Sequence, residues 1–368
     1  MKSKKTNKTA IVIGGGIHGM TSALELAKKG VGVTVLEKKP SIMSGTSNAT
    51  HNRAHMGYHY PRSVETAEEC LRGLSFFKKN FSAALNYPGK SYYLLERSDS
   101  KTSAKDFEKF CKKIKIPYQT IKEDDLLWNK KNIECGFCVP EPIFNVDILR
   151  KLLKKEANRL GINIVTNSEV TGFLKKDNVY EIITGNKSKT KKYTADIILN
   201  ATYAHTNSIL KILGLEQDMT EYELQKTEVV VVKSSKKLPA LTVMDGNFIS
   251  LMPLAGTKNK YLVYDVTHSV VHRKNGFFLG TKKTHPTNFG KMVKHGKKYF
   301  PFMDQLEFIK SNYGFRPIPL DITGDSRKTR LVQHQKHQNI YSIFEGKFIS
   351  APLIAGELVK LMKKNKTI

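Results

Sequence analysis

The sequence Ile11-Val12-Ile13-Gly14-Gly15-Gly16-Ile17-His18-Gly19 places an apolar strand directly before a glycine-rich turn of the form G-x-G-x-x-G. A helical pattern follows over residues 20–30, and a second apolar strand, residues 33–36, ends at Glu37. This order of strand, glycine turn, helix and strand ending in an acid is typical of a dinucleotide-binding β-α-β unit. It predicts that an adenine dinucleotide binds near the start of the chain.

Each of the three motif glycines has a physical role in such a unit. Gly14 allows the tight turn, Gly16 lets the backbone approach a pyrophosphate, and Gly19 lets the helix pack closely on the strand. The first turn of the helix offers free N–H groups to the phosphates, and Glu37 can accept hydrogen bonds from a ribose. The predicted cofactor contacts of this unit are Gly14, Gly16, Ile17, His18, Gly19, Glu37 and Lys38.

The chain has 368 residues and a formal net charge of +28, because 61 Lys and Arg outnumber 33 Asp and Glu. Such a charge attracts acidic metabolites, nucleic acid or an anionic lipid surface. The lysines are dispersed, however, often in pairs, and few aromatic residues alternate with them, which favours an ordinary solvated surface. No apolar run approaches the ~20 residues that a transmembrane helix needs. We expect a cytoplasmic protein without a signal peptide, and peripheral contact with a membrane stays open.

The four cysteines include Cys135-Gly136-Phe137-Cys138, which has the spacing of a metal or redox pair. A zinc site needs further ligands, and the chain has no second pair of this kind. The sequence therefore favours two small residues in a strand or turn, and we predict no metal site.

Strand and helix patterns alternate at the start, in the middle and at the end of the chain, whereas residues 222–285 are rich in strands that look antiparallel. This order predicts a discontinuous protein of two domains. Helices are predicted over residues 64–80, 104–114, 145–160 and 351–363, and strands over 91–95, 162–165, 195–202, 227–232, 248–253, 261–267, 277–279 and 339–344, with a hairpin over 169–194 that turns near 185–186.

Five stretches carry a resemblance to a known family, and they occur in the family's order. They are the glycine turn with Glu37; Gly45-Thr46-Ser47 followed by His55-x-Gly57-x-x-Tyr60; Val146-Asp147 with Gly161-Ile162-Asn163-Ile164; Asp196 to Thr202; and Gly314-Phe315-Arg316-Pro317 with 343–347. Together they resemble the D-amino-acid-oxidase-like superfamily of FAD-dependent oxidoreductases. The loop at His55 is similar to that of glycerol-3-phosphate dehydrogenases and L-2-hydroxyglutarate oxidases.

The resemblance implies an α/β FAD-binding Rossmann-type domain with a parallel sheet, and a smaller α+β substrate domain with a mostly antiparallel sheet. The FAD-binding domain would comprise residues 8–62, 143–214 and 312–366, and the substrate-binding domain residues 63–142 and 215–311. The cofactor would be FAD.

Further cofactor contacts follow from the resemblance alone. Thr46 and Ser47 would bind the pyrophosphate or ribityl chain, and the backbone of Val170 would contact the adenine. The helix that follows Gly346-Lys347 would stabilise the negative charge of reduced flavin. These implied contacts are Gly45, Thr46, Ser47, Val170, Ala201, Thr202, Gly346 and Lys347. Many relatives have glycine after Asn-Ala-Thr where this chain has Tyr203, so we expect a different turn there.

The resemblance also suggests catalytic residues. Arg316 is the candidate clamp for an anionic substrate, because its planar fork suits a carboxylate or phosphate. His55 is the preferred base and His59 the other candidate, since imidazole titrates near neutral pH. Several alternatives stay open: a covalent flavin link through His51 or His55, a base at His334 or His337, further anion contacts from Arg62 and Arg327, and a hydrogen bond from Tyr60 to the substrate.

The expected function is that of an FAD-dependent oxidase or dehydrogenase. It would oxidise a CH–OH or CH–NH carbon of a small anionic metabolite, similar to a 2-hydroxy acid or glycerol 3-phosphate, by hydride transfer to flavin N5. Oxygen, a quinone or a carrier protein would accept the electrons. Three alternatives remain: amine oxidation on an amino acid or on tRNA, a flavin-binding interaction protein without turnover, and a nicotinamide-dependent enzyme.

Overall fold

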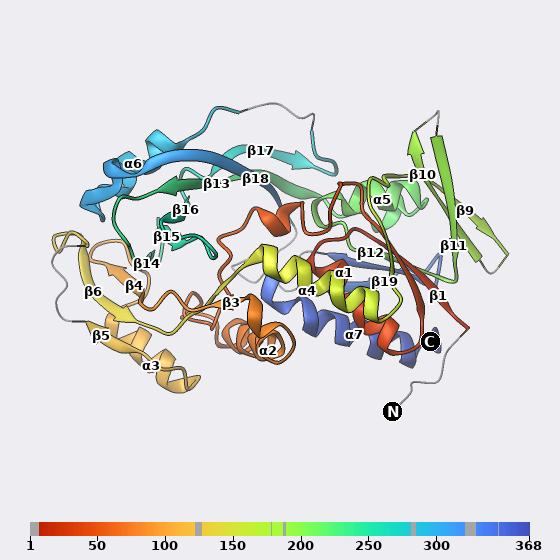
Figure 1. Ribbon diagram of the computed structural model, residues 1–368, viewed down its shortest axis with the longest axis horizontal. Coiled ribbons are helices and arrows are strands. Elements are labelled where there is room, and N and C mark those ends of the chain that lie inside the picture. Colours follow the sequence, from red (N-terminus) through yellow and green to blue (C-terminus); the bar gives the residue numbers. More distant parts are fainter. Residues whose placement is uncertain are drawn as a thin grey trace.

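The computed structural model describes residues 7–121, 127–177, 179–186, 189–280, 285–320, 329–344 and 346–368. The molecule is elongated, with one large sheet toward each end and a group of helices between and below them (Figure 1). None of the described helices is long and apolar enough to cross a bilayer.

The first sheet is built around the glycine turn. Its strands are β1 (Thr9–Ile13), β2 (Gly32–Leu36), β8 (Asn163–Val165), β12 (Ile197–Asn200), β19 (Arg330–Gln333) and β20 (Ile340–Phe344), in the order β19-β20-β12-β1-β2-β8. All neighbours are parallel except β19 and β20, which form an antiparallel edge. Ala10 and Val12 enter one apolar core, and Ile11 and Ile13 enter another. Both faces of the sheet are therefore buried, as expected for a parallel sheet.

Helices cover one face of this sheet, and a small sheet covers the other (Figure 1). The helices are α1 (Ile17–Lys28), α4 (Val146–Arg159) and α7 (Ala351–Lys364), with α2 (Val64–Phe81) packed against α7. The opposite face carries α5 (Thr206–Ile212) and the antiparallel strands β9 (Val170–Lys176), β10 (Val179–Asn186) and β11 (Lys189–Ala195). The predicted hairpin is thus part of a three-stranded sheet, and the chain reverses directly after the predicted turn, between Asn186 and Lys189, which still pair with each other.

The second sheet forms the other end of the molecule and is mostly antiparallel, as predicted. It contains β4 (Ser91–Glu96), β5 (Gln119–Ile121), β6 (Ile133–Cys138), β13 (Tyr222–Lys233), β14 (Ala240–Met244), β15 (Ile249–Pro253), β16 (Lys260–Asp265), β17 (Val270–Gly276) and β18 (Glu307–Pro319). Only β4 and β14 pair in parallel. Helices α3 (Ala104–Lys113) and α6 (Phe289–Gly296) pack into the separate cores on its two faces. A short pair, β3 (Leu85–Asn86) and β7 (Ile143–Phe144), completes the strands.

Two strand predictions fail in this sheet. The strand predicted at 277–279 does not form, because β17 ends at Gly276 and the carbonyl of Phe277 accepts a hydrogen bond from the Asn207 side chain. The long strand β18 was not predicted, although it contains the Gly-Phe-Arg-Pro motif. It pairs with β13 along its whole length, and such pairing outweighs the weak strand propensity of its glycine and prolines.

Cys135 and Cys138 lie on strand β6, as the favoured interpretation predicted. Cys135 packs against one apolar core and Cys138 against the other, so the two thiols point to opposite faces of the sheet. The strands of the first sheet all lie within the segments 8–62, 143–214 and 312–366, and the division into two domains at those boundaries stays a prediction.

Candidate active site

The glycine turn lies at the carboxyl end of β1 and leads into α1. Gly14 has a φ of 103°, and a Cβ atom there would lie 2.7 Å from the carbonyl oxygen of Ala201. A Cβ atom on Gly19 would lie 1.9 Å from the carbonyl oxygen of Gly14. Both positions therefore require glycine. The turn stays close to β12, at the edge where parallel sheets bind their ligands.

Glu37 follows the last residue of β2, where the ribose is predicted to bind. Its Oε2 accepts the N–H of Gly15 and its Oε1 accepts the N–H of Lys39, both at 2.8 Å, and the residue is 8% exposed. The backbone carbonyl of Glu37 accepts the N–H of Ser168, two residues before Val170, which is buried. Lys38 extends to the surface, where its Nζ is 3.1 Å from Nε2 of His205. The predicted adenosine contacts are thus neighbours in space.

The loop Gly45-Thr46-Ser47 sits between α1 and β18. The Oγ of Ser47 accepts the N–H of Ile17 at 3.2 Å, so this residue lies on the N-terminus of α1, where a phosphate is predicted. The hydroxyl of Thr46 instead bonds both the N–H and the carbonyl of Phe315, each at 3.3 Å. Thr46 therefore joins this loop to the strand that carries Arg316.

The end of β12 forms the turn that was expected to differ. The N–H of Ala201 donates to Ile13 at 2.9 Å, and the hydroxyl of Thr202 donates to the side chain of Asn200 at 2.7 Å. Tyr203 has a φ of 57°, the left-handed region that glycine favours. Tyrosine thus adopts here a backbone conformation that a glycine would adopt freely, and the expected difference from relatives stays a prediction.

Gly346 and Lys347 connect the end of the chain to α1. A Cβ atom on Gly346 would lie 2.6 Å from Nε2 of His18, so the imidazole packs directly against this backbone. Burial lowers the pKa of His18 to about 4. The Nζ of Lys347 lies 4.6 Å from the ring centroid of Tyr60, at the start of the turn that leads into α7. Lys347 thus reaches the loop that contains the candidate base.

Three histidines of one loop form the centre of the candidate site. The rings of His55 and His59 are 5.5 Å apart, and His55 is equally far from Tyr60. Among the described residues, one buried ring nitrogen in each of His51, His55 and His59 has no hydrogen-bond partner. Buried polar atoms normally have partners, so these nitrogens mark a surface that fits a bound molecule.

Burial and nearby positive charge keep these imidazoles neutral. Desolvation, the charge of Arg53 and the charge of Lys347 lower the pKa of His55 well below its usual value. Desolvation, with His55 and Arg53, lowers the pKa of His59 to about 3. A neutral imidazole can accept a proton, but the lowered pKa also makes each of these imidazoles a weaker base.

Arg53 and Glu141 hold the histidine loop in place, and the sequence analysis missed both. The Nη1 of Arg53 is 2.7 Å from Oε2 of Glu141 and 2.6 Å from the hydroxyl of Tyr93, while Oε1 of Glu141 accepts the N–H of Met56 at 2.9 Å. Two signals were present: an arginine between the loop histidines, and an acid between Pro140 and Pro142 in a basic chain.

Arg316 lies on β18, and its hydrogen bonds are with neutral groups. Its Nε is 2.8 Å from Oε1 of Gln225, and its Nη1 is 3.3 Å from the hydroxyl of Tyr264. The ring of Tyr264 meets that of His51 edge to face at 4.5 Å. No carboxylate among the described residues pairs with Arg316, which is half-buried. The structure therefore links a guanidinium, which has no carboxylate partner within the described ranges, to the histidine loop through Tyr264.

The remaining candidates have other partners. Arg62 pairs with Asp245 at 2.8 Å. His334 bonds Asp218 and Ser342 at the edge of the first sheet. His337 packs against Phe173 and Tyr180. None of these contacts involves the histidine loop, and Arg327 lies outside the described residues.

The comparison with protein families agrees with this geometry. A family described as FAD dependent oxidoreductase, abbreviated DAO, matches residues 9–361. The chain belongs to this family. Its cofactor is FAD, and the residues present fit that group: a helix N-terminus capped by a glycine, a buried carboxylate at the end of β2 and unpartnered imidazole nitrogens. The family match thus assigns the glycine turn to FAD rather than to a nicotinamide cofactor.

Curated relatives are distant in sequence. An FAD-dependent monooxygenase, kojA, of Aspergillus flavus is 27% identical over 71% of this chain and 62% of its own length. The anaerobic glycerol-3-phosphate dehydrogenase subunit A1 of Haloferax volcanii is 24% identical over 96% of this chain and 63% of its own length. The chain thus spans less than two thirds of the length of these relatives.

Solved structures share the fold. The L-α-glycerophosphate oxidase of Mycoplasma pneumoniae, with FAD bound, has a TM-score of 0.74 at 19% identity, covering 97% of this chain and 94% of that one. The glycine oxidase of Geobacillus kaustophilus has a TM-score of 0.72 at 16% identity, covering 97% and 95%. Because their names include both alcohol- and amine-type substrates, the fold does not select between these substrate classes.

Proposed function

We propose that this flavoprotein oxidises a CH–OH carbon of a small anionic metabolite, of the 2-hydroxy acid or glycerol 3-phosphate type. The observation that carries the proposal is Arg316, a half-buried guanidinium whose partners among the described residues, Gln225 and Tyr264, are both uncharged. A carboxylate or phosphate would supply the missing counter-charge and would bind in the bidentate manner that arginine favours.

Arg316, His55 and Glu141 have different roles in the proposed reaction. Arg316 binds the anionic group and orients the substrate toward the histidine loop. His55, neutral because of its lowered pKa, accepts the proton of the substrate hydroxyl. The carboxylate of Glu141, 3.9 Å from Nδ1 of His55, stabilises the imidazolium that results. The chemistry that bound FAD supplies is the acceptance of a hydride at flavin N5.

The names of the relatives support an anionic alcohol. Two of them are anaerobic glycerol-3-phosphate dehydrogenase subunits, from Haloferax volcanii and Haemophilus influenzae, which match 96% and 97% of this chain. The positive charges of Arg316 and Lys347 suit the same kind of ligand, since both lie at the histidine loop or at residues that contact it.

The test is anaerobic titration of the purified flavoprotein. Glycerol 3-phosphate, L-2-hydroxyglutarate and a panel of amino acids and amines are added in turn, and the oxidised flavin band near about 450 nm is followed. We expect a hydroxy acid or a phosphorylated alcohol to bleach the band. Bleaching by an amino acid or amine alone would contradict the proposal and select the second candidate, oxidation of a CH–NH carbon. The uncharged analogue glycerol serves as the control for the anionic group.

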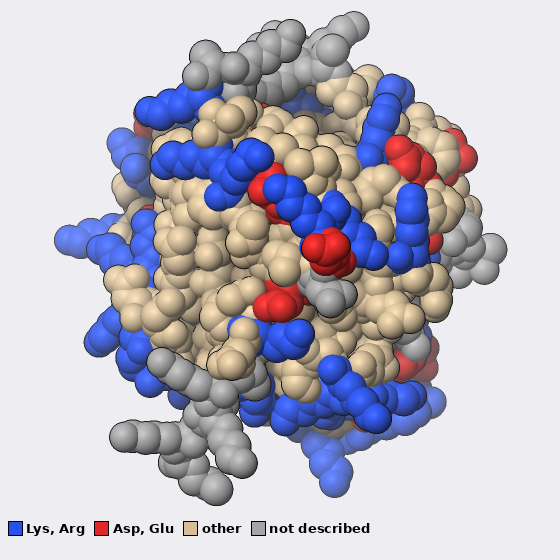
Figure 2. Space-filling model, turned by 90° about the vertical axis from the view of Figure 1, so that its right-hand side faces the viewer, with Lys and Arg blue, Asp and Glu red and all other residues tan. Residues whose placement is uncertain are grey.

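A macromolecular substrate such as tRNA is less well supported by the surface. Figure 2 shows the end of the molecule that carries β9, β10 and β11, where Lys and Arg are spread around the face and interrupted by acids. Lys176 and Lys192 both pair with Glu181, at 3.5 and 3.0 Å. This pattern matches a solvated surface. If RNA binds, its affinity will fall steeply with salt.

A further inference from the structure

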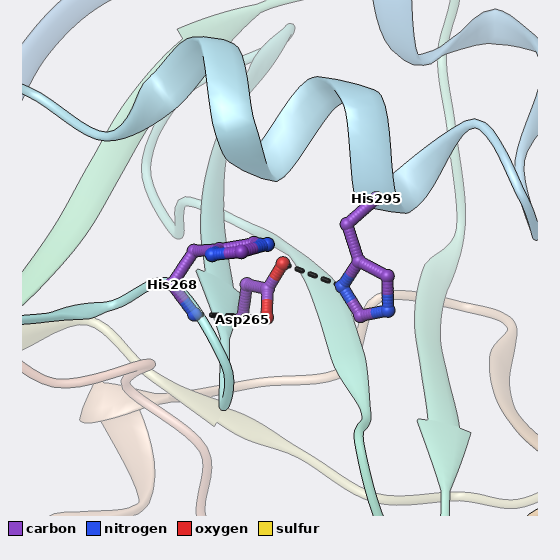
Figure 3. Close-up of side chains that lie close together, drawn as sticks. All are labelled: Asp265, His268 and His295. Carbon is purple, nitrogen blue, oxygen red and sulfur yellow. Dashed lines mark hydrogen bonds and ion pairs between the residues drawn. The ribbon is translucent and has the colours of Figure 1, made fainter.

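A second cluster of polar side chains lies on the outer face of the large antiparallel sheet. Asp265 is the last residue of β16, His268 lies in the turn to β17, and His295 lies in the last turn of α6. One ligand atom from each of the three lies within 4.8 Å of the other two. Figure 3 shows the carboxylate of Asp265 between the two imidazoles, below helix α6.

Asp265 is a buried carboxylate whose ion-pair partner, in the part of the chain that the structure describes, is a histidine. It has no exposed surface, and among the described residues its ion pair is with His295 alone, at 2.7 Å between Oδ2 and Nδ1. A buried carboxylate is costly unless it is paired or bound to a metal. No Lys or Arg of the described segments pairs with this carboxylate, which leaves Oδ2 to the imidazole of His295.

The turn that carries the cluster is held in shape by its own hydrogen bonds. Oδ1 of Asp265 accepts the N–H of Thr267 at 2.8 Å and that of His268 at 3.2 Å. The N–H of Asp265 donates to the hydroxyl of Ser269 at 3.0 Å. The side chain of Asn288 donates to the carbonyl of His268 at 2.9 Å, which joins the turn to the start of α6. Oδ2 and the imidazoles are thereby left to face one another.

We propose that Asp265, His268 and His295 bind a divalent transition-metal cation, with Zn²⁺ as the best match. Two imidazole nitrogens and one carboxylate oxygen form a common Zn²⁺ donor set, to which water adds the fourth ligand. His268 and His295 are half-buried, so the cluster is open to solvent on one side for that water. Tetrahedral ligands around zinc lie about 3.3 Å apart, so side-chain shifts of about 1 Å complete the site.

The bound cation would join β16 to α6 on the side of the sheet opposite the candidate active site. The residue before Asp265 is Tyr264, whose side chain points to the other face and contacts Arg316 and His51. A cation at Asp265 would therefore hold in place the strand that presents Tyr264. The cation site itself does not depend on the proposed substrate.

The test is a Zn²⁺ titration of untagged, FAD-loaded protein that has been treated with EDTA and dialysed. Calorimetry is expected to show one Zn²⁺ per chain with a Kd of about 1 µM or tighter. His268→Gln and His295→Gln are each expected to weaken binding at least about 10-fold, because each removes one of three ligands. The Tm of the unsubstituted protein rises with Zn²⁺, and that of the variants does not.

A matched control uses the other close pair of imidazoles in the same region. The rings of His272 and His285 are 5.4 Å apart, and neither residue belongs to the proposed donor set. His272→Gln should bind Zn²⁺ as the unsubstituted protein does. Loss of binding in this control, or equal binding in His268→Gln and His295→Gln, would overturn the assignment, as would a Kd weaker than about 1 mM for the unsubstituted chain. Unchanged flavin content and circular dichroism show that the variants are folded.

Discussion

The guanidinium of Arg53 and the carboxylate of Glu141 form an ion pair at 2.7 Å, and their side chains are only 3% and 0% exposed. The pair joins the histidine loop to the segment that leads into β7, because Glu141 also accepts the N–H of Met56. It therefore fixes the backbone next to His55, the residue whose imidazolium Glu141 is proposed to stabilise.

Removing the charge of Glu141 should destabilise the protein strongly. Glu141→Gln leaves the buried Arg53 unpaired, and breaking a buried pair in this way typically costs about 3–5 kcal/mol. Urea unfolding measures the change in the free energy of unfolding. The control is Glu156→Gln, which breaks the exposed pair with Arg159 and should cause little change. Equal effects of the two substitutions would contradict the structural role of the pair.

Arg316 should determine the affinity for the anionic substrate. Arg316→Leu removes charge-assisted hydrogen bonds worth about 1.5–3 kcal/mol, so KM should rise about 10- to 100-fold. The exposed Arg273, which pairs with Glu223 on the neighbouring strands, provides the control Arg273→Leu with unchanged KM. Steady-state kinetics with the substrate found by flavin reduction gives both values. If Arg316→Leu leaves KM unchanged, Arg316 is not the residue that binds the anionic group of the substrate.

His55 should act on the chemical step. His55→Gln is expected to lower kcat about 100-fold or more, because general-base catalysis contributes at least about that factor. Since the pKa of His55 is lowered, its neutral form persists as the pH falls, and kcat/KM of the unsubstituted enzyme should show no acid limb near the usual histidine value of 6.5. His334→Gln, whose bonds are to Asp218 and Ser342, is the control that should keep kcat. If His334→Gln loses activity and His55→Gln does not, the general base is His334 and not His55.

Gly19→Ala should impair binding of FAD. The added Cβ would lie 1.9 Å from a backbone oxygen of Gly14, so the turn that approaches the pyrophosphate has to move. The ratio of flavin to protein absorbance is expected to fall severalfold. At Gly32 the nearest atom to an added Cβ is 3.6 Å away, an ordinary contact, and Gly32→Ala should keep its flavin. A yellow Gly19→Ala protein with full flavin content would argue against this placement of the cofactor.

Mild acid should destabilise the fold through His18. Its pKa is about 4 in the folded protein against 6.5 when unfolded, so the unfolded chain binds more protons below pH 6.5. The contribution of His18 to the free energy of unfolding is therefore fully present above pH 6.5. It falls as the pH decreases toward 4, by about 2 kcal/mol between about pH 7 and pH 5.

The variant His18→Gln tests this linkage. It should lose less free energy of unfolding over the same pH range, whereas His272→Gln, at an exposed position, should behave as the unsubstituted protein does. Urea unfolding at the two pH values gives the comparison. An identical pH dependence in His18→Gln would show that His18 is not the group responsible.

Local patterns in the sequence predicted a large part of this protein. The glycine turn, the helix after it and the acid at Glu37 follow one another within 30 residues, and their geometry is set by short-range backbone sterics and helix periodicity. Strong apolar patterns likewise predicted α2, α4 and α7 closely. These signals were sufficient to predict a nucleotide-binding α/β sheet and, by the order of its segments, the FAD dependent oxidoreductase family.

The tertiary structure alone decided which distant side chains meet. Arg53 with Glu141, His51 with Tyr264, and Asp265 with His295 come from separate elements, and no local pattern in the sequence says which of these residues meet. Strand β18 shows the same effect, since its long pairing with β13 forms a strand that its own composition does not favour. The physical reason is that propensity and periodicity act over a few residues, whereas packing and buried charge pairs depend on the whole chain being folded.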